Sequence, residues 1–208
     1  GEMIQAIRIG SDRITKVVEN LKEFARADAG GDFKALNLNE VVEKTLVIVG
    51  GQIRKSAMDI RVNLADDLPD VKGNFQKLEQ VIANLLVNAA QSIPNREKGS
   101  IRIGTRFLES FRCVLLEVED NGTGMNTDVL ERIFEPFFTR RRNSGGTGLG
   151  LSVSYGLVQE HGGKIGVHSR PGIGSRFMVF LPVVEKLKVD LRPAILCVDD
   201  DEMMLDML

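Results

Sequence analysis

The chain has 208 residues, of which 43% are hydrophobic and 27% are charged, and its formal net charge is −2. This length and apolar content are sufficient for one sizeable domain with shorter appended segments. The small net charge gives no indication of a nucleic-acid partner or of binding to an anionic membrane, and no apolar run is long enough to cross a bilayer. The two cysteines, Cys113 and Cys197, lack metal-ligand spacing, so we expect reduced thiols and a cytoplasmic location.

Residues 1–29 have the pattern of a helix with a narrow apolar seam. The seam residues alternate spacings of three and four, with one polar interruption at Ser11: Ile4, Ile7, Ile14, Val18, Leu21 and Ala25. So narrow a seam favours packing against a partner helix, and a helix folded onto its own domain is the alternative. Ala29-Gly30-Gly31-Asp32 ends the pattern. Because the chain opens inside this pattern, we expect it to be a piece of a longer protein.

The following residues predict short strands that alternate with helices. The most regular helix begins at Asn74 and ends at Ile93, with apolar residues at i, i+3 and i+4. In chain order we expect a strand at 33–38, a helix at 37–54, a strand at 60–64, the helix at 74–93, a hairpin of 100–107 with 112–119, a short helix at 127–133, a long loop at 135–147, a helix at 149–160, and an antiparallel pair of 164–169 with 175–182.

Two glycine-containing segments predict the two ends of a nucleotide-binding site. Asp120-Asn121-Gly122-Thr123-Gly124 follows an apolar strand, so an acceptor carboxylate stands beside glycines that permit close approach of a ligand. Gly145–Leu151 leads into a predicted helix, whose N-terminal N–H groups and dipole favour phosphate. Each segment alone is also consistent with an ordinary turn, whereas the pair predicts a nucleotide held at both ends.

Asn84 and Asn88 are four residues apart on the predicted helix 74–93, and therefore lie beside one another at the edge of its apolar stripe. A carboxamide oxygen is a suitable ligand for Mg²⁺, which shares phosphate oxygens and keeps several waters. A pair of surface amides is the alternative interpretation. The spacing by itself leaves both interpretations open.

Four segments together resemble the motifs of the sensor histidine kinases. In the family's order, Gln80–Ala90 resembles the N box, Asp120–Gly124 the first glycine box, Ile133–Thr139 the F box and Gly146–Leu151 the second glycine box. The last two are most similar to the branch that includes nitrogen- and oxygen-sensing kinases. The resemblance implies a catalytic domain over residues 32–188 with the Bergerat ATP-binding fold, an α+β, two-layer α/β sandwich. In that fold ATP lies between the long helix and a flexible lid.

The resemblance also implies a role for each matched residue at the base. Asp120, with Gly122 and Gly124 nearby, accepts a hydrogen bond from the adenine amino group. Ser175 stands where the family usually has threonine, and its hydroxyl supports a water at adenine. Phe134, together with Phe137 and Phe138, anchors the lid.

At the phosphates, the resemblance implies that Asn88 coordinates Mg²⁺ and that Asn84 lies beside the phosphate groups. Arg140 reaches the γ-phosphate and, with Asn84, is expected to be catalytic, whereas at least one of Arg141 and Arg142 is expected to be a solvated lid residue. The remaining expected contacts to the nucleotide come from the second glycine box, namely Gly146, Thr147, Gly148, Leu149 and Gly150.

The implied reaction is transfer of the γ-phosphate of Mg-ATP to a histidine. Related gyrase, chaperone and mismatch-repair ATPases carry a glutamate where this chain has Asn84. An amide cannot take a proton from water, so transfer is favoured over hydrolysis. The chain has two histidines, His161 and His168. Neither is expected to be the acceptor, because the family's acceptor lies on a helix that precedes the one resembled by Arg13–Arg26. The chain is therefore expected to bind Mg-ATP without phosphorylating itself.

Residues 193–208 resemble the start of a response-regulator receiver domain, with Asp199 and Asp200 at its magnesium-binding acids, and a plain acidic tail is the alternative. The resemblance implies a hybrid kinase whose partners are a receiver domain and a second copy of the chain, joined through the N-terminal helix. We expect no nucleic-acid partner and no membrane contact within these residues. Two other functions stay open: a nucleotide-gated binding module without turnover, and a Bergerat-type ATPase.

Overall fold

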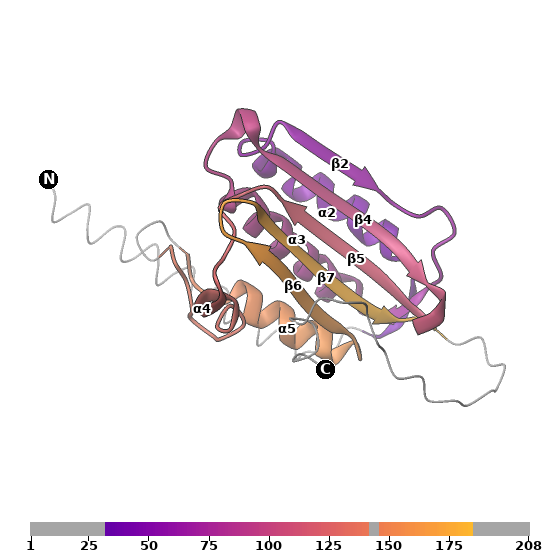
Figure 1. The fold of residues 1–208 in the computed structure, drawn as a ribbon. Coiled ribbons are helices and arrows are strands. Elements are labelled where there is room, and N and C mark those ends of the chain that lie inside the picture. The colour runs from indigo at the N-terminus through magenta and orange to yellow at the C-terminus, as the bar shows by residue number, and fades with distance from the viewer. Residues whose placement is uncertain (1–31, 142–145, 185–208) are drawn as a thin grey trace, which may run out of the picture.

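The computed structural model describes residues 32–141 and 146–184, which form two layers, a sheet and the helices that cover one of its faces (Figure 1). The covering helices are α2 (Leu38–Ile53), α3 (Phe75–Ser92) and α5 (Gly150–Glu160). This arrangement confirms the predicted α+β two-layer sandwich. The predicted helix at 1–29, the receiver-like segment at 193–208 and residues 142–145 lie outside the described residues.

The main sheet has five strands in the order β2–β4–β5–β7–β6. The strands are β2 (Asp59–Asn63), β4 (Ser100–Leu108), β5 (Cys113–Asp120), β7 (Gly174–Pro182) and β6 (Lys164–Arg170). β2 pairs with β4 in parallel, and the other three pairs are antiparallel. A separate two-stranded ribbon joins β1 (Lys34–Leu36) to β3 (Val71–Gly73). The register of β5 with β7 sets Asp120 opposite Ser175, which brings two predicted site residues together.

The two long helices begin at the predicted residues, and an asparagine side chain caps each of them. The Asn37 side chain accepts the N–H of Asn39 at 2.9 Å, and the Asn74 side chain accepts the N–H of Lys77 at 3.1 Å. Among the described helices, none combines the length and the apolar character needed to cross a membrane.

The shorter elements differ from the sequence prediction in two details. α4 (Thr127–Leu130) is shorter than the predicted helix at 127–133, because the backbone then continues in turns, with the Glu135 N–H donating to Arg132 O. A 3-10 turn, η2 (Glu109–Phe111), joins β4 to β5, and a second one, η1 (Arg96–Lys98), follows α3.

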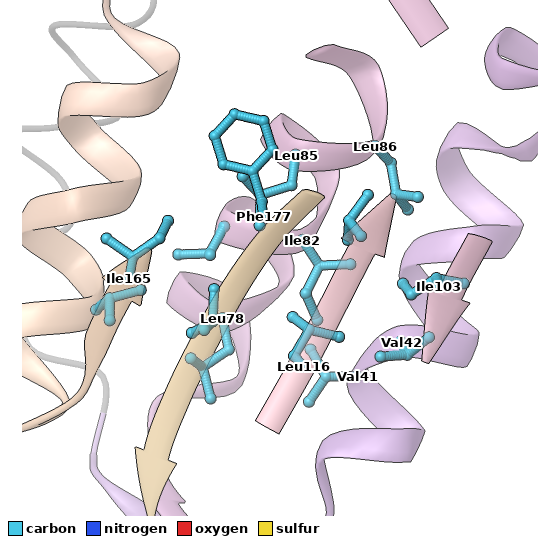
Figure 2. Packing of buried hydrophobic residues seen from close by; sticks show 14 of the residues in the cluster. Val41, Val42, Leu78, Ile82, Leu85, Leu86, Ile103, Leu116, Ile165 and Phe177 are labelled. Atoms are coloured by element: carbon cyan, nitrogen blue, oxygen red, sulfur yellow. The ribbon is translucent and has the colours of Figure 1, made fainter. Parts of the chain in front are cut away.

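The core lies between α3, α2 and the inner face of the sheet. Figure 2 shows Leu78, Ile82 and Leu85 of α3 among the side chains of the facing strands, and each of the three is at most 1% exposed. Burial of each such side chain contributes about 1.5–3 kcal/mol. Because this apolar face fixes the rotation of α3, Asn84 and Asn88 are left half-buried at its margin. The packing of the core therefore fixes the positions of these two amides at the edge of α3.

Candidate functional site

A cavity of about 1040 Å³ lies beside α3, between the C-terminal end of β5 and the N-terminus of α5. A volume of this order suits a small molecule or a cofactor. Most of the residues predicted from the sequence line it: Asn84, Asn88, Asp120, Gly124, Arg140, Gly146, Thr147, Gly148, Leu149, Gly150 and Ser175. Two predicted residues, Gly122 and Phe134, are not among its lining residues.

Asp120 is the last residue of β5 and is only 5% exposed. Its Oδ1 accepts hydrogen bonds from Ser92 Oγ at 2.6 Å and from the Gly122 N–H at 2.8 Å. Burial raises the pKa of Asp120, and the hydrogen bonds from Ser92, Gly122 and the Ser175 N–H, with the charge of Arg141, oppose that rise. A buried carboxylate held in one orientation can recognise a hydrogen-bond donor on a ligand.

The loop after Asp120 is fixed by contacts on two sides. The Thr123 N–H donates to Ser92 O at 3.0 Å, and Asn121 Nδ2 donates to Lys98 O at 2.7 Å. A Cβ atom at Gly122 would lie 1.9 Å from Ser92 Oγ, so this position requires glycine. Gly122 thus shapes the site from behind the carboxylate.

Ser175, opposite Asp120 on β7, has a hydroxyl whose role is set by its neighbours. Ser169 Oγ donates to Gly174 O at 2.8 Å, accepts the Met125 N–H at 2.9 Å and lies 3.0 Å from Ser175 Oγ. Because the single Ser169 hydrogen is used on Gly174 O, Ser175 must donate to Ser169. The lone pairs of Ser175 therefore act as acceptors toward the cavity.

Asn84 and Asn88 form the middle of the α3 wall but have different contacts. Asn84 Nδ2 donates to Gly150 O at 3.2 Å and to Ser154 Oγ at 3.3 Å, so this amide joins α3 to the first turn of α5. Within the described part of the chain, the Asn88 side chain makes no hydrogen bond. Its carboxamide oxygen is available to a ligand or a cation, and it is the type of oxygen donor that Mg²⁺ accepts.

The segment Gly146–Leu149 leads into α5, whose N-terminus faces the cavity. No side chain of the residues that the structure describes caps this helix, so its first N–H groups and the positive end of its dipole can meet an anion. The Leu149 N–H is the exception, because it donates to Thr147 Oγ1 at 3.4 Å. This end of the cavity is suited to phosphate.

The F-box residues do not all pack in the way that was expected. Phe134 packs against Tyr155 of α5 in a tilted arrangement with ring centres 5.3 Å apart, and Arg132 lies over the Phe138 ring at 4.7 Å. The prediction that Phe137 anchors this segment is wrong, because its side chain is 57% exposed. Phe137 has a φ of 65°, in the left-handed region that few residues other than glycine adopt.

The two described arginines of this segment also behave differently from one another. Arg140 is exposed, and its contact with Gly124 O is long, at 3.5 Å. Arg141 is half-buried and donates to Gln91 Oε1 at 2.6 Å and to the backbone oxygen of Gln91. Arg141 therefore binds the C-terminal turn of α3 beside Asp120. The expectation that at least one of Arg141 and Arg142 is solvated stays a prediction, because Arg142 lies outside the described residues.

Sequence reasoning overlooked Ser92, Gln91 and Ser169. Ser92 follows Asn88 by four residues, as Asn88 follows Asn84, so the same helical spacing places all three on one stripe. That repeat was the available signal for Ser92. Gln91 and Ser169 carried none, because their roles come from residues distant in sequence.

His161 has a structural position and not a catalytic one. It ends α5, is 5% exposed, and accepts the Asn74 N–H on Nε2 at 3.0 Å. Its Nδ1 lies 2.7 Å from Leu157 O and therefore carries the ring proton. Both nitrogens are occupied, so the ring ties the end of α5 to the start of α3.

The stability of the domain should fall as the pH is lowered through about 6.5, the ordinary pKa of histidine. Burial lowers the pKa of His161, so between the folded and unfolded values the unfolded chain binds a proton that the folded domain does not. Urea unfolding between pH 7.5 and pH 5.5, both about one unit from that value, will show this slope. His161→Leu should flatten it, with His168→Gln as the matched control. An unchanged slope in His161→Leu would contradict the assignment.

A two-layer sandwich with a buried carboxylate at one end of a cavity and an uncapped helix N-terminus at the other defines a nucleotide-binding domain of the Bergerat type. The chain belongs to the histidine kinase-, DNA gyrase B-, and HSP90-like ATPase family, whose profile matches residues 73–185.

Named relatives agree with this family. Over 173 residues the chain is 37% identical to the signal transduction histidine-protein kinase AtoS of Escherichia coli, a match that covers 83% of this chain and 27% of AtoS. The catalytic domain of histidine kinase ThkA is 30% identical with a TM-score of 0.64, covering 74% of this chain and 99% of that one. ThkA in complex with the response regulator protein TrrA is 27% identical with a TM-score of 0.66, covering 84% and 49%. The chain spans 21–38% of the length of the curated relatives it matches.

Proposed function

We propose that the chain is the ATP-binding catalytic domain of a sensor histidine kinase of the nitrogen- and oxygen-sensing branch, which transfers the γ-phosphate of Mg-ATP to a histidine on a partner helix. One observation carries the proposal. The Asp120 carboxylate and the N-terminus of α5 stand at opposite ends of a single cavity, with Asn84 and Asn88 on the wall between them. The similarity to AtoS and to the catalytic domain of ThkA supports it.

At the base, Asp120 accepts a hydrogen bond from the exocyclic amine of adenine, and the lone pairs of Ser175 accept from a water or from the base. Ser92 and Gly122 hold the carboxylate in place. The loop behind it is fixed, so this end of the site is preorganised for one purine orientation.

At the phosphates, Asn88 would hold Mg²⁺ through its carboxamide oxygen, and the ion would neutralise charge that develops on the transferred group. The N-terminus of α5 donates N–H groups to the phosphates, and Asn84 keeps that helix against α3. Arg140 lines the same cavity and can move to the γ-phosphate, since its contact with Gly124 O is long. The reaction then depends on positioning and on charge neutralisation.

ATP hydrolysis is the second candidate, and one residue favours it. The half-buried carboxylate of Glu79 lines the same cavity, on the same helix as Asn84. A carboxylate can act as a base toward water, whereas an amide cannot. Glu79 precedes Asn84 by five residues, which separates their Cα atoms by about 7.5 Å along the axis, so Glu79 does not stand at the position where the related ATPases carry their glutamate. This separation favours transfer.

The proposal extends to the partners of the parent protein. We infer a homodimer through the helix predicted at 1–29, a response-regulator receiver domain as phosphate acceptor, a second receiver beginning at 193–208, and a cytoplasmic location. The complex of ThkA with the response regulator TrrA supports the receiver partner, since ThkA is similar to this chain.

The test adds a separate polypeptide that carries the dimerisation helix with its histidine, in the presence of labelled ATP and Mg²⁺. We expect acid-labile, base-stable label on the added polypeptide and none on this chain. Asn88→Ala should slow the transfer at least about 100-fold, because the metal-held phosphates lose their position. Asn63→Ala, an exposed amide on β2, is the matched control.

Each other outcome decides against the proposal. Release of free phosphate that Glu79→Gln abolishes would establish the ATPase. Nucleotide binding with neither labelled histidine nor free phosphate would establish a nucleotide-gated binding module.

A further inference from the structure

We propose that Ser92 is a positioning residue that couples adenine binding to the loss of one proton from Asp120, so that the choice between adenine and a 6-keto purine depends on pH. This inference rests on the proposed function, because it assigns the base-recognition chemistry of the same site. It follows from a count of hydrogens around one hydroxyl group.

Ser92 Oγ lies within hydrogen-bond distance of two oxygen atoms. It is 2.6 Å from Asp120 Oδ1 and 2.8 Å from the backbone oxygen of Ala89. A hydroxyl group has a single hydrogen to donate. When Asp120 is ionised, both neighbours are acceptors, and one of the two contacts has no hydrogen.

A proton on Asp120 completes the chain of contacts. Asp120 Oδ1 then donates to Ser92 Oγ, and Ser92 donates to Ala89 O, so each short contact carries its own hydrogen. The Ser92 hydroxyl can therefore stay bonded to either form of Asp120, and its donation to the ionised carboxylate opposes the rise in the pKa of Asp120 that burial causes. When Asp120 is ionised, the Ser92 hydroxyl donates its hydrogen to Asp120 Oδ1, and the contact with Ala89 O is left without a hydrogen.

A small number of groups around Asp120 determine whether it is protonated or ionised. From β7 and the loop it faces the neutral N–H groups of Ser175 and Gly122, and in the sheet register it lies opposite the apolar Ile101 of β4. Arg141 is the charged group that acts on it within the described residues, and Arg141 favours ionisation. Burial acts in the opposite direction and raises the pKa of Asp120.

The ligand decides which form of Asp120 is bound. The 6-amino group of adenine donates a hydrogen, so it matches the ionised carboxylate and expels the proton. A 6-keto purine, such as hypoxanthine, offers an acceptor at the same place and matches the protonated acid. Ser92 serves both forms, since its hydroxyl donates to the carboxylate and accepts from the acid.

The test compares the binding of adenosine diphosphate and inosine diphosphate by calorimetry between about pH 5 and pH 7.5, in two buffers of different ionisation enthalpy. The two nucleotides carry the same phosphates, so the ratio of their dissociation constants cancels phosphate titration. In the wild type we expect proton release with the adenine nucleotide and a preference for adenine that falls several-fold toward about pH 5.

The Ser92 variants separate this role from a structural one. Ser92→Ala removes a donor to the ionised form, so the pH at which the preference falls should move upward by about one unit. Ser92→Thr keeps the hydroxyl and should restore the wild-type midpoint, and thermal melting checks that both variants are folded. A wild-type preference that does not change with pH, or an unchanged midpoint in folded Ser92→Ala, overturns the role of Ser92. Failure of the wild type to bind either nucleotide at any pH overturns the proposed function itself.

Discussion

Asp120→Asn should weaken binding of adenine nucleotides by about 10- to 100-fold, equivalent to about 1.5–3 kcal/mol, while the domain stays as stable as the wild type or becomes more stable. The loss arises because the amide replaces a charge-assisted acceptor at the exocyclic amine. Stability should not fall, because burial raises the pKa of Asp120, which means that the folded state disfavours the charge that asparagine removes.

Calorimetric titration with adenosine diphosphate and a thermal melt on the same sample measure both quantities. Asp67→Asn is the matched control, since Asp67 is an exposed carboxylate in the turn before β3. Weaker nucleotide binding with unchanged or higher stability distinguishes this prediction from partial unfolding, because partial unfolding would lower binding and stability together. Full binding by a folded Asp120→Asn variant would place the base elsewhere.

Gly124→Ala should destabilise the domain by about 4 kcal/mol or more, a loss that single substitutions seldom reach. Gly124 has a φ of 63°, and a Cβ atom there would lie 1.9 Å from the backbone oxygen of Arg170. That oxygen belongs to the end of β6 and cannot move away by a change of rotamer. The loop that follows Asp120 would have to shift, so nucleotide binding should fall as well.

Gly172→Ala provides a close control for this substitution. Gly172 has a similar φ of 76°, but a Cβ atom there would meet no atom of the residues described by the structure within 4 Å. Its substitution should cost only the strain of a left-handed residue, about 1–2 kcal/mol. Urea unfolding of the two variants separates strain from collision, and equal losses would show that the approach of Gly124 to Arg170 does not matter.

The residues recognisable from the sequence share one property, namely that their function depends on local spacing. Asn84 and Asn88 are one helical turn apart, and Asp120 directly follows an apolar strand, so both features can be recognised from the spacing of residues in the sequence. The starts of the two long helices at Asn37 and Asn74 were predicted too, and the structure shows that both asparagines act locally as caps. Local hydrogen bonds and periodic burial do not need the rest of the fold.

The errors and omissions come from contacts between distant segments. Phe137 belongs to an apolar run and was expected to be anchored, yet a left-handed φ leaves it exposed. The contact of Arg141 was not foreseen either, since this residue reaches Gln91, fifty residues earlier in the chain. Neither outcome has a signal in sequence spacing, because both depend on where the segment before α5 crosses the end of α3.

The sequence by itself determined which elements form and which chemical groups stand ready at their ends: a carboxylate after a strand, two amides on a helix and glycines before a helix. Periodic burial and capping are decided within a few neighbouring residues, so these features needed no knowledge of the fold. Only the tertiary structure decided that Ser92 shares its one hydrogen between Ala89 and Asp120, and that Ser175 presents lone pairs to the cavity. Hydrogen bonds of this kind require atoms to meet within about 3 Å, and packing of α3 against β5 and β7 sets that distance.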